Sequence, residues 1–132
     1  MRVLALDYGS ARCGCAVSDP SGTIVTPIDP VLLPASKRGF QTLRRLVAER
    51  EAEMVLVGLP LGLDGNDTEQ TRDTRAFARR LSDGIGEGIP VEMYDERFTT
   101  KMAQRMKGRR STSEDSRAAA HLLESWLTAQ AR

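Results

Sequence analysis

Val3-Leu4-Ala5-Leu6-Asp7-Tyr8-Gly9 is the stretch of sequence that decides the fold. Every position before Asp7 is apolar, which predicts a central strand that is buried on both faces of its sheet. Asp7 then marks the carboxyl end of that strand. A second apolar run, Met54-Val55-Leu56-Val57-Gly58, lies between two predicted helices and is typical of a buried parallel strand.

Turn, capping and periodicity signals place the remaining elements. Asp19-Pro20-Ser21-Gly22 predicts a tight turn between antiparallel strands, and Ser36 is the predicted N-cap of the first helix. The predicted strands span residues 2–7, 12–18, 23–32, 54–58 and 90–95, and the predicted helices span 36–51, a segment after 65, a short segment from Thr99 or Thr100 to Gly108, and 114–129. This βββαβαβαα order predicts an α/β fold with a mixed five-stranded sheet and helices on both faces, in one domain over residues 1–132.

The second helix has two possible starts. Asn66 with Glu69, and Asp67 with Gln70, both have the spacing of a capping box. The periodicity predicts that Ala76, Phe77 and Leu81 face inward.

Three carboxylates fall where a soluble domain does not normally place them: Asp7, Glu96 and Asp115. Asp7 and Glu96 each end a predicted strand, and open α/β sheets bind ligands at the carboxyl ends of their strands. Asp115 shares the i, i+4, i+7, i+11 stripe of the last helix with Ala119, Leu122 and Trp126. Asp115 is therefore expected to point toward the sheet.

Gathering these acids is costly without a counter-charge. Two carboxylates about 5 Å apart repel by ~3 kcal/mol at an effective dielectric constant of about 20. Hard oxygen ligands without a Cys/His cluster favour Mg²⁺ or Mn²⁺ over zinc, and two such ions could clamp a scissile phosphate. In the alternative interpretation Asp115 caps its helix, Asp7 is a turn residue, and Glu96 pairs with Arg97 or Lys101.

Composition limits the class of protein. With 132 residues and 40% hydrophobic content the chain can bury one core, and it has neither an apolar run long enough to span a membrane nor a signal-peptide pattern. A cytoplasmic protein without a membrane partner is therefore expected. Cys13 and Cys15 are expected to be small buried strand residues, because their spacing matches neither a redox nor a zinc motif.

Arginine clusters give local basic character to a chain whose net charge is only +1. Lys107-Gly108-Arg109-Arg110 precedes the helix of Asp115, which makes Lys107, Arg109 and Arg110 candidate phosphate contacts or, alternatively, a solvated linker. Arg72, Arg75 and Arg79 share one helix face, for which a solvated surface is the favoured interpretation.

Four motifs in order resemble the YqgF/RuvX family of bacterial Holliday junction resolvase-like proteins, within the ribonuclease H-like superfamily. They are Asp7-Tyr8-Gly9-Ser10-Ala11-Arg12-Cys13-Gly14-Cys15-Ala16-Val17-Ser18-Asp19, Gly58-Leu59-Pro60 with Asp64-Gly65, Asp95-Glu96-Arg97-Phe98-Thr99-Thr100, and Asp115-Ser116-Arg117-Ala118-Ala119. The sequence departs from the family at Cys13 and Cys15, where larger aliphatic residues are usual, and at Gly62, where a polar residue is more common.

The resemblance implies a ribonuclease H-like fold and a metal-dependent nuclease with Asp7, Glu96 and Asp115 as its acidic triad. The implied activity is maturation of the 5′ end of pre-16S rRNA or, alternatively, cleavage of four-way DNA junctions. RNA is the favoured nucleic-acid partner, structured DNA remains possible, and the protein could be a monomer or a homodimer.

Further residues are candidates for contact with substrate. Gly9 lets a phosphate approach the backbone beside Asp7, and Arg12 is expected to contact phosphate unless it pairs with Asp19. Arg97 is expected to hold substrate or to orient Glu96. Two other classes remain open: an actin-like phosphotransferase, which the chain length opposes, and a nucleic-acid-binding domain without catalysis.

Overall fold

The computed structural model describes residues 1–98 and 114–131. Along the chain the elements are β1 (Val3–Asp7), β2 (Arg12–Ser18), β3 (Val25–Leu32), α1 (Lys37–Glu49), β4 (Met54–Leu59), α2 (Glu69–Gly84), β5 (Val91–Asp95), the 3₁₀ turn η1 (Glu96–Phe98) and α4 (Glu114–Gln130). These bounds agree closely with the ranges predicted from sequence. The short helix predicted between Thr99 or Thr100 and Gly108 lies outside the described residues.

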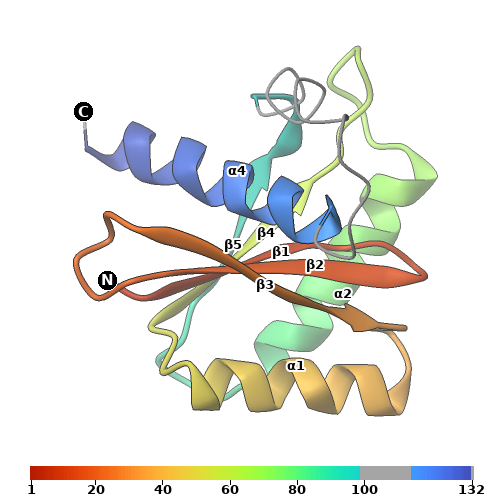
Figure 1. The fold of residues 1–132 in the computed structure, drawn as a ribbon. Coiled ribbons are helices and arrows are strands. Elements are labelled where there is room, and N and C mark those ends of the chain that lie inside the picture. The colour runs from red at the N-terminus through yellow and green to blue at the C-terminus, as the bar shows by residue number, and fades with distance from the viewer. Residues whose placement is uncertain (99–113, 132) are drawn as a thin grey trace.

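The five strands form one mixed sheet in the order β3-β2-β1-β4-β5 (Figure 1). The pairs β1–β2 and β2–β3 are antiparallel, whereas β1–β4 and β4–β5 are parallel. As its apolar sequence predicted, β1 lies at the centre of the sheet, and Val3 through Leu6 are at most 1% exposed. The α/β class and the mixed five-stranded sheet are confirmed.

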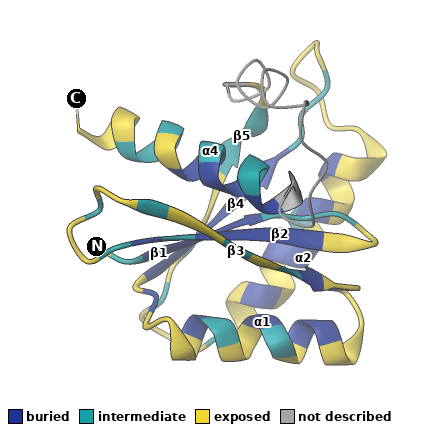
Figure 2. Cartoon of the chain, viewed as in Figure 1, coloured by how far each residue is buried: buried dark blue, intermediate teal, exposed yellow. Residues whose placement is uncertain are grey.

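Helices cover both faces of this sheet (Figures 1 and 2). On one face Leu4 and Leu6 of β1 pack with Leu43 of α1 and Phe77 of α2. On the other face, Val3 and Ala5 pack with residues of α4 that include Leu122 and Leu123. Odd-numbered residues of β1 therefore face α4, and even-numbered residues face α1 and α2.

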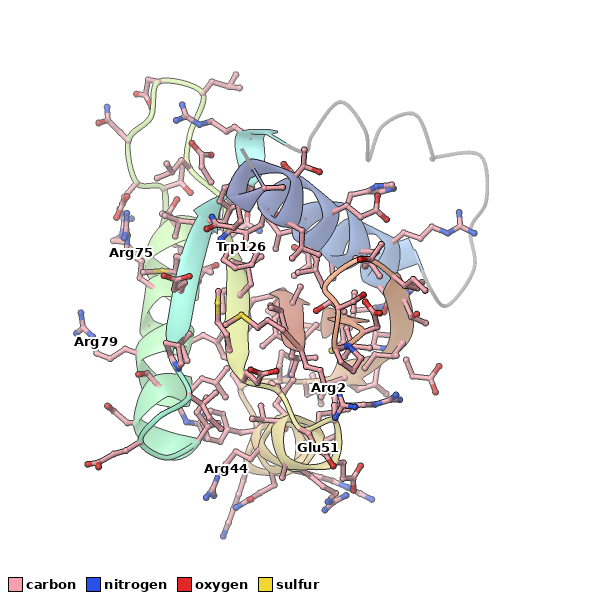
Figure 3. The ribbon with its side chains drawn as sticks, turned by 90° about the vertical axis from the view of Figure 1, so that its left-hand side faces the viewer. Arg2, Arg44, Glu51, Arg75, Arg79 and Trp126 are labelled. Carbon is pink, nitrogen blue, oxygen red and sulfur yellow. The ribbon has the colours of Figure 1, made fainter. Side chains whose placement is uncertain are left out.

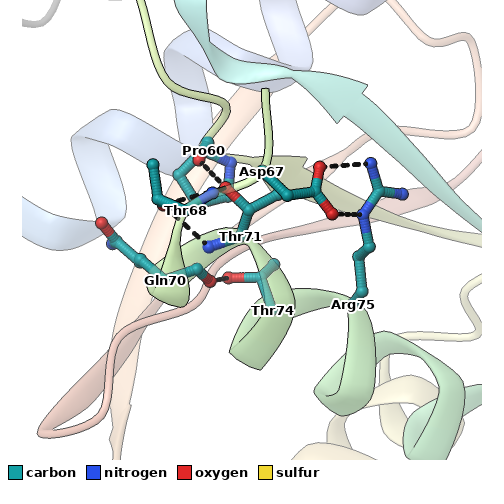
Figure 4. Close-up of polar contacts among 7 residues, drawn as sticks. All are labelled: Pro60, Asp67, Thr68, Gln70, Thr71, Thr74 and Arg75. Atoms are coloured by element: carbon teal, nitrogen blue, oxygen red, sulfur yellow. Dashed lines mark hydrogen bonds and ion pairs between the residues drawn. The ribbon is translucent and has the colours of Figure 1, made fainter. Parts of the chain in front are cut away.

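The start of α2 differs from both predicted capping boxes. Thr68 is the N-cap, and its side chain and that of Thr71 exchange hydrogen bonds with each other's backbone N–H (Figure 4). The Thr71 hydroxyl also donates to the Pro60 carbonyl. Asp67 instead accepts two hydrogen bonds from Arg75, at 2.9 and 3.1 Å. The carboxylate that was expected to cap the helix is thus engaged by an arginine two turns further on.

The inward face of α2 is also more polar than predicted. Phe77 and Leu81 are buried as expected, but Ala76 is exposed, and Thr71 and Thr74 are fully buried. Each threonine hydroxyl donates to a backbone carbonyl, which satisfies it inside the core. Threonine was overlooked because the pattern was read from apolar residues alone.

The strand β3 lies at one edge of the sheet and contains Pro27 and Pro30. Next to it in β2, Cys13 and Cys15 are free thiols at 0% exposure, as predicted for small buried residues. In the part of the chain that the structure describes, none of the helices combines the length and apolar character needed to cross a membrane.

Candidate functional site

Asp7 lies at the carboxyl end of β1 on the face covered by α4. Side chains alternate along a strand, so Asp7 follows Val3 and Ala5 toward that helix. In the parallel pairing with β4, Leu6 is opposite Val57, so the next position along sets Asp7 beside Gly58. Tyr8 turns to the opposite face, where its ring stacks on Phe77 with the centroids 4.2 Å apart.

Glu96 reaches the same place from β5. A Cβ added at Gly58 would lie 3.4 Å from Oε1 of Glu96 and 3.2 Å from Cδ2 of Leu122 in α4. The Glu96 carboxylate therefore lies over Gly58 on the α4 side of the sheet. Asp7 points to the same side of the sheet from the neighbouring strand β1, and neighbouring strands are about 4.8 Å apart. The missing side chain at residue 58 leaves room for the Glu96 carboxylate on the side of the sheet to which Asp7 points.

The first turn of α4 is tied to the sheet by Ser116. The β2–β3 register shifts between Cys13 and Cys15, and such a bulge disrupts the ladder locally. The Cys15 N–H donates to Oγ of Ser116 at 3.2 Å, and the same hydroxyl donates to the carbonyl of Ile28. Cys15 is opposite Leu6 in the β1–β2 pairing. The helix therefore begins over the strand pair that ends in Asp7.

Asp115 is the residue before Ser116 in α4, but its side chain lies outside the described part of the structure. Lys107, Arg109 and Arg110 also lie outside the described residues. Among the residues whose side chains the structure describes, no three His, Cys, Asp or Glu side chains gather closely enough to hold a metal ion. Asp7 and Glu96 are thus the two members of the predicted triad whose side chains the structure describes.

Arg97 is held by Asp95 rather than by Glu96. Its guanidinium makes hydrogen bonds of 2.7 to 3.1 Å to the Asp95 carboxylate, and this arginine holds the pKa of Asp95 below its ordinary value. Nη1 of Arg97 also lies 3.5 Å from the position of a Cβ added at Gly65, whose φ of +84° suits glycine. Arg97 therefore links β5 to the loop after β4, and it pairs with Asp95 where the alternative interpretation offered a pair with Glu96.

Gly9 and Arg12 form the turn between β1 and β2 at the same edge of the sheet. A Cβ at Gly9 would lie 2.9 Å from the carbonyl oxygen of Arg12, so only glycine fits this close approach. Arg12 is exposed at the start of β2, and Asp19 follows the far end of that strand. At about 3.3 Å per residue the two are about 20 Å apart, which rules out the alternative Arg12–Asp19 ion pair.

A cleft of about 590 Å³ opens beside this turn, between Tyr8–Ser10 and the start of α2. Asp73 contributes to its lining. Burial, followed by the negative charge of Asp73, raises the pKa of Tyr8 above its ordinary value. The neutral form of the phenol is therefore favoured at the wall of this cleft.

Gly58 and Ser116 are the two site-building residues that sequence reasoning missed as such. Gly58 was read as the end of an apolar strand, although a glycine that follows four buried residues signals close approach of another group. The sequence carried no clear signal for Ser116, because the same helix also contains Ser125 and Thr128; its buried position in the fold is what gives its hydroxyl backbone partners.

Two solved resolvases share the fold. Thermus thermophilus RuvC in complex with a Holliday junction substrate matches with a TM-score of 0.62 at 15% identity, over 99% of this chain and 96% of that chain. The fowlpox virus resolvase in complex with Holliday junction DNA matches with a TM-score of 0.60 at 11% identity, over 100% of both chains. This likeness confirms the predicted ribonuclease H-like fold.

Two bacterial relatives are considerably more similar in sequence. A protein of Clavibacter michiganensis is 45% identical over 104 residues, which is 76% of this chain and 62% of that protein. A protein of Sulfurihydrogenibium is 34% identical over 131 residues, which is 96% of this chain and 89% of that protein. Both carry the provisional name pre-16S rRNA nuclease. The family model described as "RuvX: Holliday junction resolvase" matches residues 1–129, so the chain belongs to the RuvX family, as its four motifs predicted.

Proposed function

We propose that this protein is a metal-dependent nuclease that processes the 5′ end of pre-16S rRNA in the cytoplasm. The observation that carries this proposal is the position of Glu96 over Gly58, at the carboxyl edge of the sheet and on the side to which Asp7 of the neighbouring strand points. The names of the relatives support the substrate. Family membership supports hydrolysis of phosphodiester bonds.

The residues at this edge fit divalent cations. The carboxylates of Asp7 and Glu96 lie on the same side of the sheet at its carboxyl edge, and oxygen donors of this kind are the ligands preferred by Mg²⁺ and Mn²⁺. We assign Asp7, Glu96 and Asp115 as the residues that would hold one or two such ions. When bound, these ions supply an activated water and stabilisation of the charge that develops at the scissile phosphate.

The remaining residues act on the substrate itself. Gly9 brings the backbone close to a phosphate, and Arg12 offers a bidentate guanidinium beside it. Asp95 fixes the direction of Arg97, so that this arginine can meet substrate without a large loss of side-chain freedom. Lys107, Arg109 and Arg110 are assigned to further phosphate contacts ahead of α4.

The decisive test is a cleavage panel with purified protein. Single-stranded RNA that contains the precursor 5′ end, RNA duplex and four-way DNA junctions are incubated with Mn²⁺, with Mg²⁺ and with excess chelator. We expect cleavage of the RNA that the chelator abolishes and either metal restores. Undiminished cleavage in excess chelator would refute the metal-dependent mechanism.

Asp115→Asn is the matched variant for this panel, because it keeps the size of the side chain and removes one charge. We expect it to abolish cleavage and to leave the metal-free protein equally stable or more stable by ~1 to 2 kcal/mol, since carboxylate repulsion is relieved. Mn²⁺ should then stabilise only the wild type. An active variant would remove Asp115 from the proposed acidic triad.

Cleavage of four-way DNA junctions is the second candidate, favoured by the description of the family model. Symmetric cutting of two strands requires two active sites, so this activity should appear together with a dimer in solution. A protein that binds these nucleic acids tightly but cuts none of them with either metal would instead be a non-catalytic binding domain.

A further inference from the structure

The outer face of α1 carries a concentrated positive charge. Lys37, Arg38, Arg44 and Arg45 are all exposed, and we call these four residues the α1 basic face. Arg38 and Arg45 lie opposite Phe40, Leu43 and Val47, which bury the helix against the sheet, whereas Lys37 and Arg44 flank that buried side. Figure 3 shows Arg44 projecting away from the sheet at this end of the molecule.

This charge is not balanced locally. The stretch 37–50 contains five cationic residues and one acid, a net charge of +4, whereas the whole chain has a net charge of +1. The described part of the chain contains ion pairs such as Arg75–Asp67 and Arg97–Asp95. None of the ion pairs among the described residues involves the α1 basic face. Within the same described residues, Arg44 donates one side-chain hydrogen bond of 3.4 Å to Gln41.

The order of charges along α1 opposes the stability of the helix. Its first turn contains no acid and its last turn no base. Lys37 and Arg38 instead lie at the positive end of the helix dipole, and at the negative end Glu49 precedes the C-cap residue Arg50, so the unfavourable placement is that of the N-terminal bases. A sequence selected only for a stable, soluble helix would place these charges the other way round. The pattern therefore indicates a role for the positive charge outside the fold.

The α1 basic face begins next to the proposed catalytic edge. The Leu33 N–H donates to the Ala11 carbonyl, and Leu32 is the β-ladder partner of Arg12. A Cβ at Gly39 would lie 2.0 Å from the Leu33 carbonyl oxygen, so α1 packs tightly against the end of β3. From there α1 continues for 13 residues, or about 20 Å, away from the turn that carries Gly9 and Arg12.

We propose that the α1 basic face binds the phosphate backbone of the RNA substrate in a segment flanking the cleavage site. This inference rests on the proposed nuclease function and adds to it a second contact surface, which lies on the opposite side of the sheet from α4. Arginine suits this role because its planar guanidinium matches phosphate oxygens in a bidentate manner. The face selects substrates long enough to extend from the catalytic edge along α1.

The chain offers a closely matched pair of variants for the test. Arg38→Gln/Arg45→Gln removes two charges spaced seven residues apart on α1. Arg72→Gln/Arg79→Gln removes two exposed arginines with the same spacing on α2, where Figure 3 shows Arg79 projecting from another side of the molecule. Glutamine keeps good helix propensity, so both variants should melt within error of the wild type.

Binding is measured by fluorescence anisotropy in excess chelator, over a series of salt concentrations, so that the result does not depend on cleavage. Two RNAs are used: one that covers only the catalytic edge, and one that is longer by more than the length of α1. For the long RNA we expect the α1 variant to bind about tenfold more weakly at low salt. Its plot of log K against log salt should be shallower by about 1.4, since each lost phosphate contact on a single strand contributes about 0.7. The α2 variant should bind like the wild type.

Equal salt slopes for the α1 and α2 variants would overturn the inference, and so would equal losses for the short and long RNAs. The face binds protein instead if two results occur together. An acidic protein competes with RNA for binding to the wild type, and the salt slope of RNA binding is the same for the α1 variant as for the wild type. A different outcome would refute only the proposed function. In that case the wild type binds the long RNA and the α1 variant shows the expected change in salt slope, but the wild type cleaves no RNA with either metal.

Discussion

Replacing Gly58 with alanine tests how the carboxylate of Glu96 is positioned. The new Cβ would lie 3.2 Å from Cδ2 of Leu122, inside the 3.5 to 4.0 Å separation at which carbon atoms pack best. It would also lie 3.4 Å from Oε1 of Glu96. Leu122 is 1% exposed and surrounded by core, whereas Glu96 is only half-buried. We therefore expect the carboxylate to move more than the leucine.

Two opposing terms set the change in stability. Overpacking of a core costs about 1 to 3 kcal/mol. Alanine in a strand recovers roughly 0.5 to 1 kcal/mol relative to glycine, and Gly58 is not among the described residues with positive φ, so its backbone accepts alanine. The expected net loss is about 1 kcal/mol, or about 4 °C in Tm for a chain of this size. A displaced Glu96 should weaken Mn²⁺ binding by about tenfold, which removes about 1.4 kcal/mol of metal-dependent stabilisation.

The assay is thermal melting with chelator and with Mn²⁺, together with calorimetric titration of Mn²⁺ and RNA cleavage. The double variant Gly58→Ala/Leu122→Val separates the two contacts, because it shortens the leucine that meets the new methyl group. We expect the double variant to regain part of the metal-free Tm but not the affinity for Mn²⁺. If Gly58→Ala keeps the full Mn²⁺-dependent rise in Tm and full activity, the space over Gly58 does not position Glu96 and the reasoning is refuted.

Two further predictions concern the frame of the site and its acid stability. Ser116→Ala leaves the Cys15 N–H and the Ile28 carbonyl without their shared partner, so we expect the free energy of unfolding, measured by chemical denaturation, to fall by about 1 to 3 kcal/mol. The control Ser116→Thr keeps the hydroxyl and should keep most of the stability. An unchanged denaturation midpoint for the alanine variant would contradict this prediction. Hydrogen bonds from Ser21, and then from the backbone of Ile24, lower the pKa of Asp19 from 3.8 to about 2. This lowered pKa in the folded state adds stability above pH 3.8 that is lost as the pH falls toward 2. Asp19→Asn should therefore show a smaller fall in Tm between pH 4 and pH 2 than the wild type, and parallel Tm curves would count against it.

The order of elements could be predicted from sequence because local signals agreed with the tertiary structure. The run from Val3 to Leu6 had no polar face, which left only a central strand as its place in the sheet. The turn at Asp19-Pro20-Ser21-Gly22 and the N-cap at Ser36 were local chemistry, and both occur as predicted. Such features depend on neighbours in sequence and are therefore readable without the fold.

The features that were missed depend on the path of the chain beyond the ends of helices and strands, or on residues distant in sequence. Whether Asp67 caps α2 or pairs with Arg75 depends on the path of the loop before the helix. Arg97 turned to Asp95 because the two side chains meet after the strand ends, which an alternation pattern does not describe. The space over Gly58 is created by Glu96 and Leu122 together, so a pattern within one strand could not reveal it. The side chain of Asp115 remains a prediction from helical spacing.

The two prolines of the edge strand β3 have a consequence for assembly. Without an N–H at residues 27 and 30, this edge cannot present a continuous row of donors to an incoming strand. The β3 flank is thereby protected against edge-to-edge aggregation. The opposite edge is β5, where Glu92 and Met93 are exposed and the strand contains no proline. Joining of two copies into a continuous sheet would therefore occur through β5, and a contact at the β3 flank would be made by side chains.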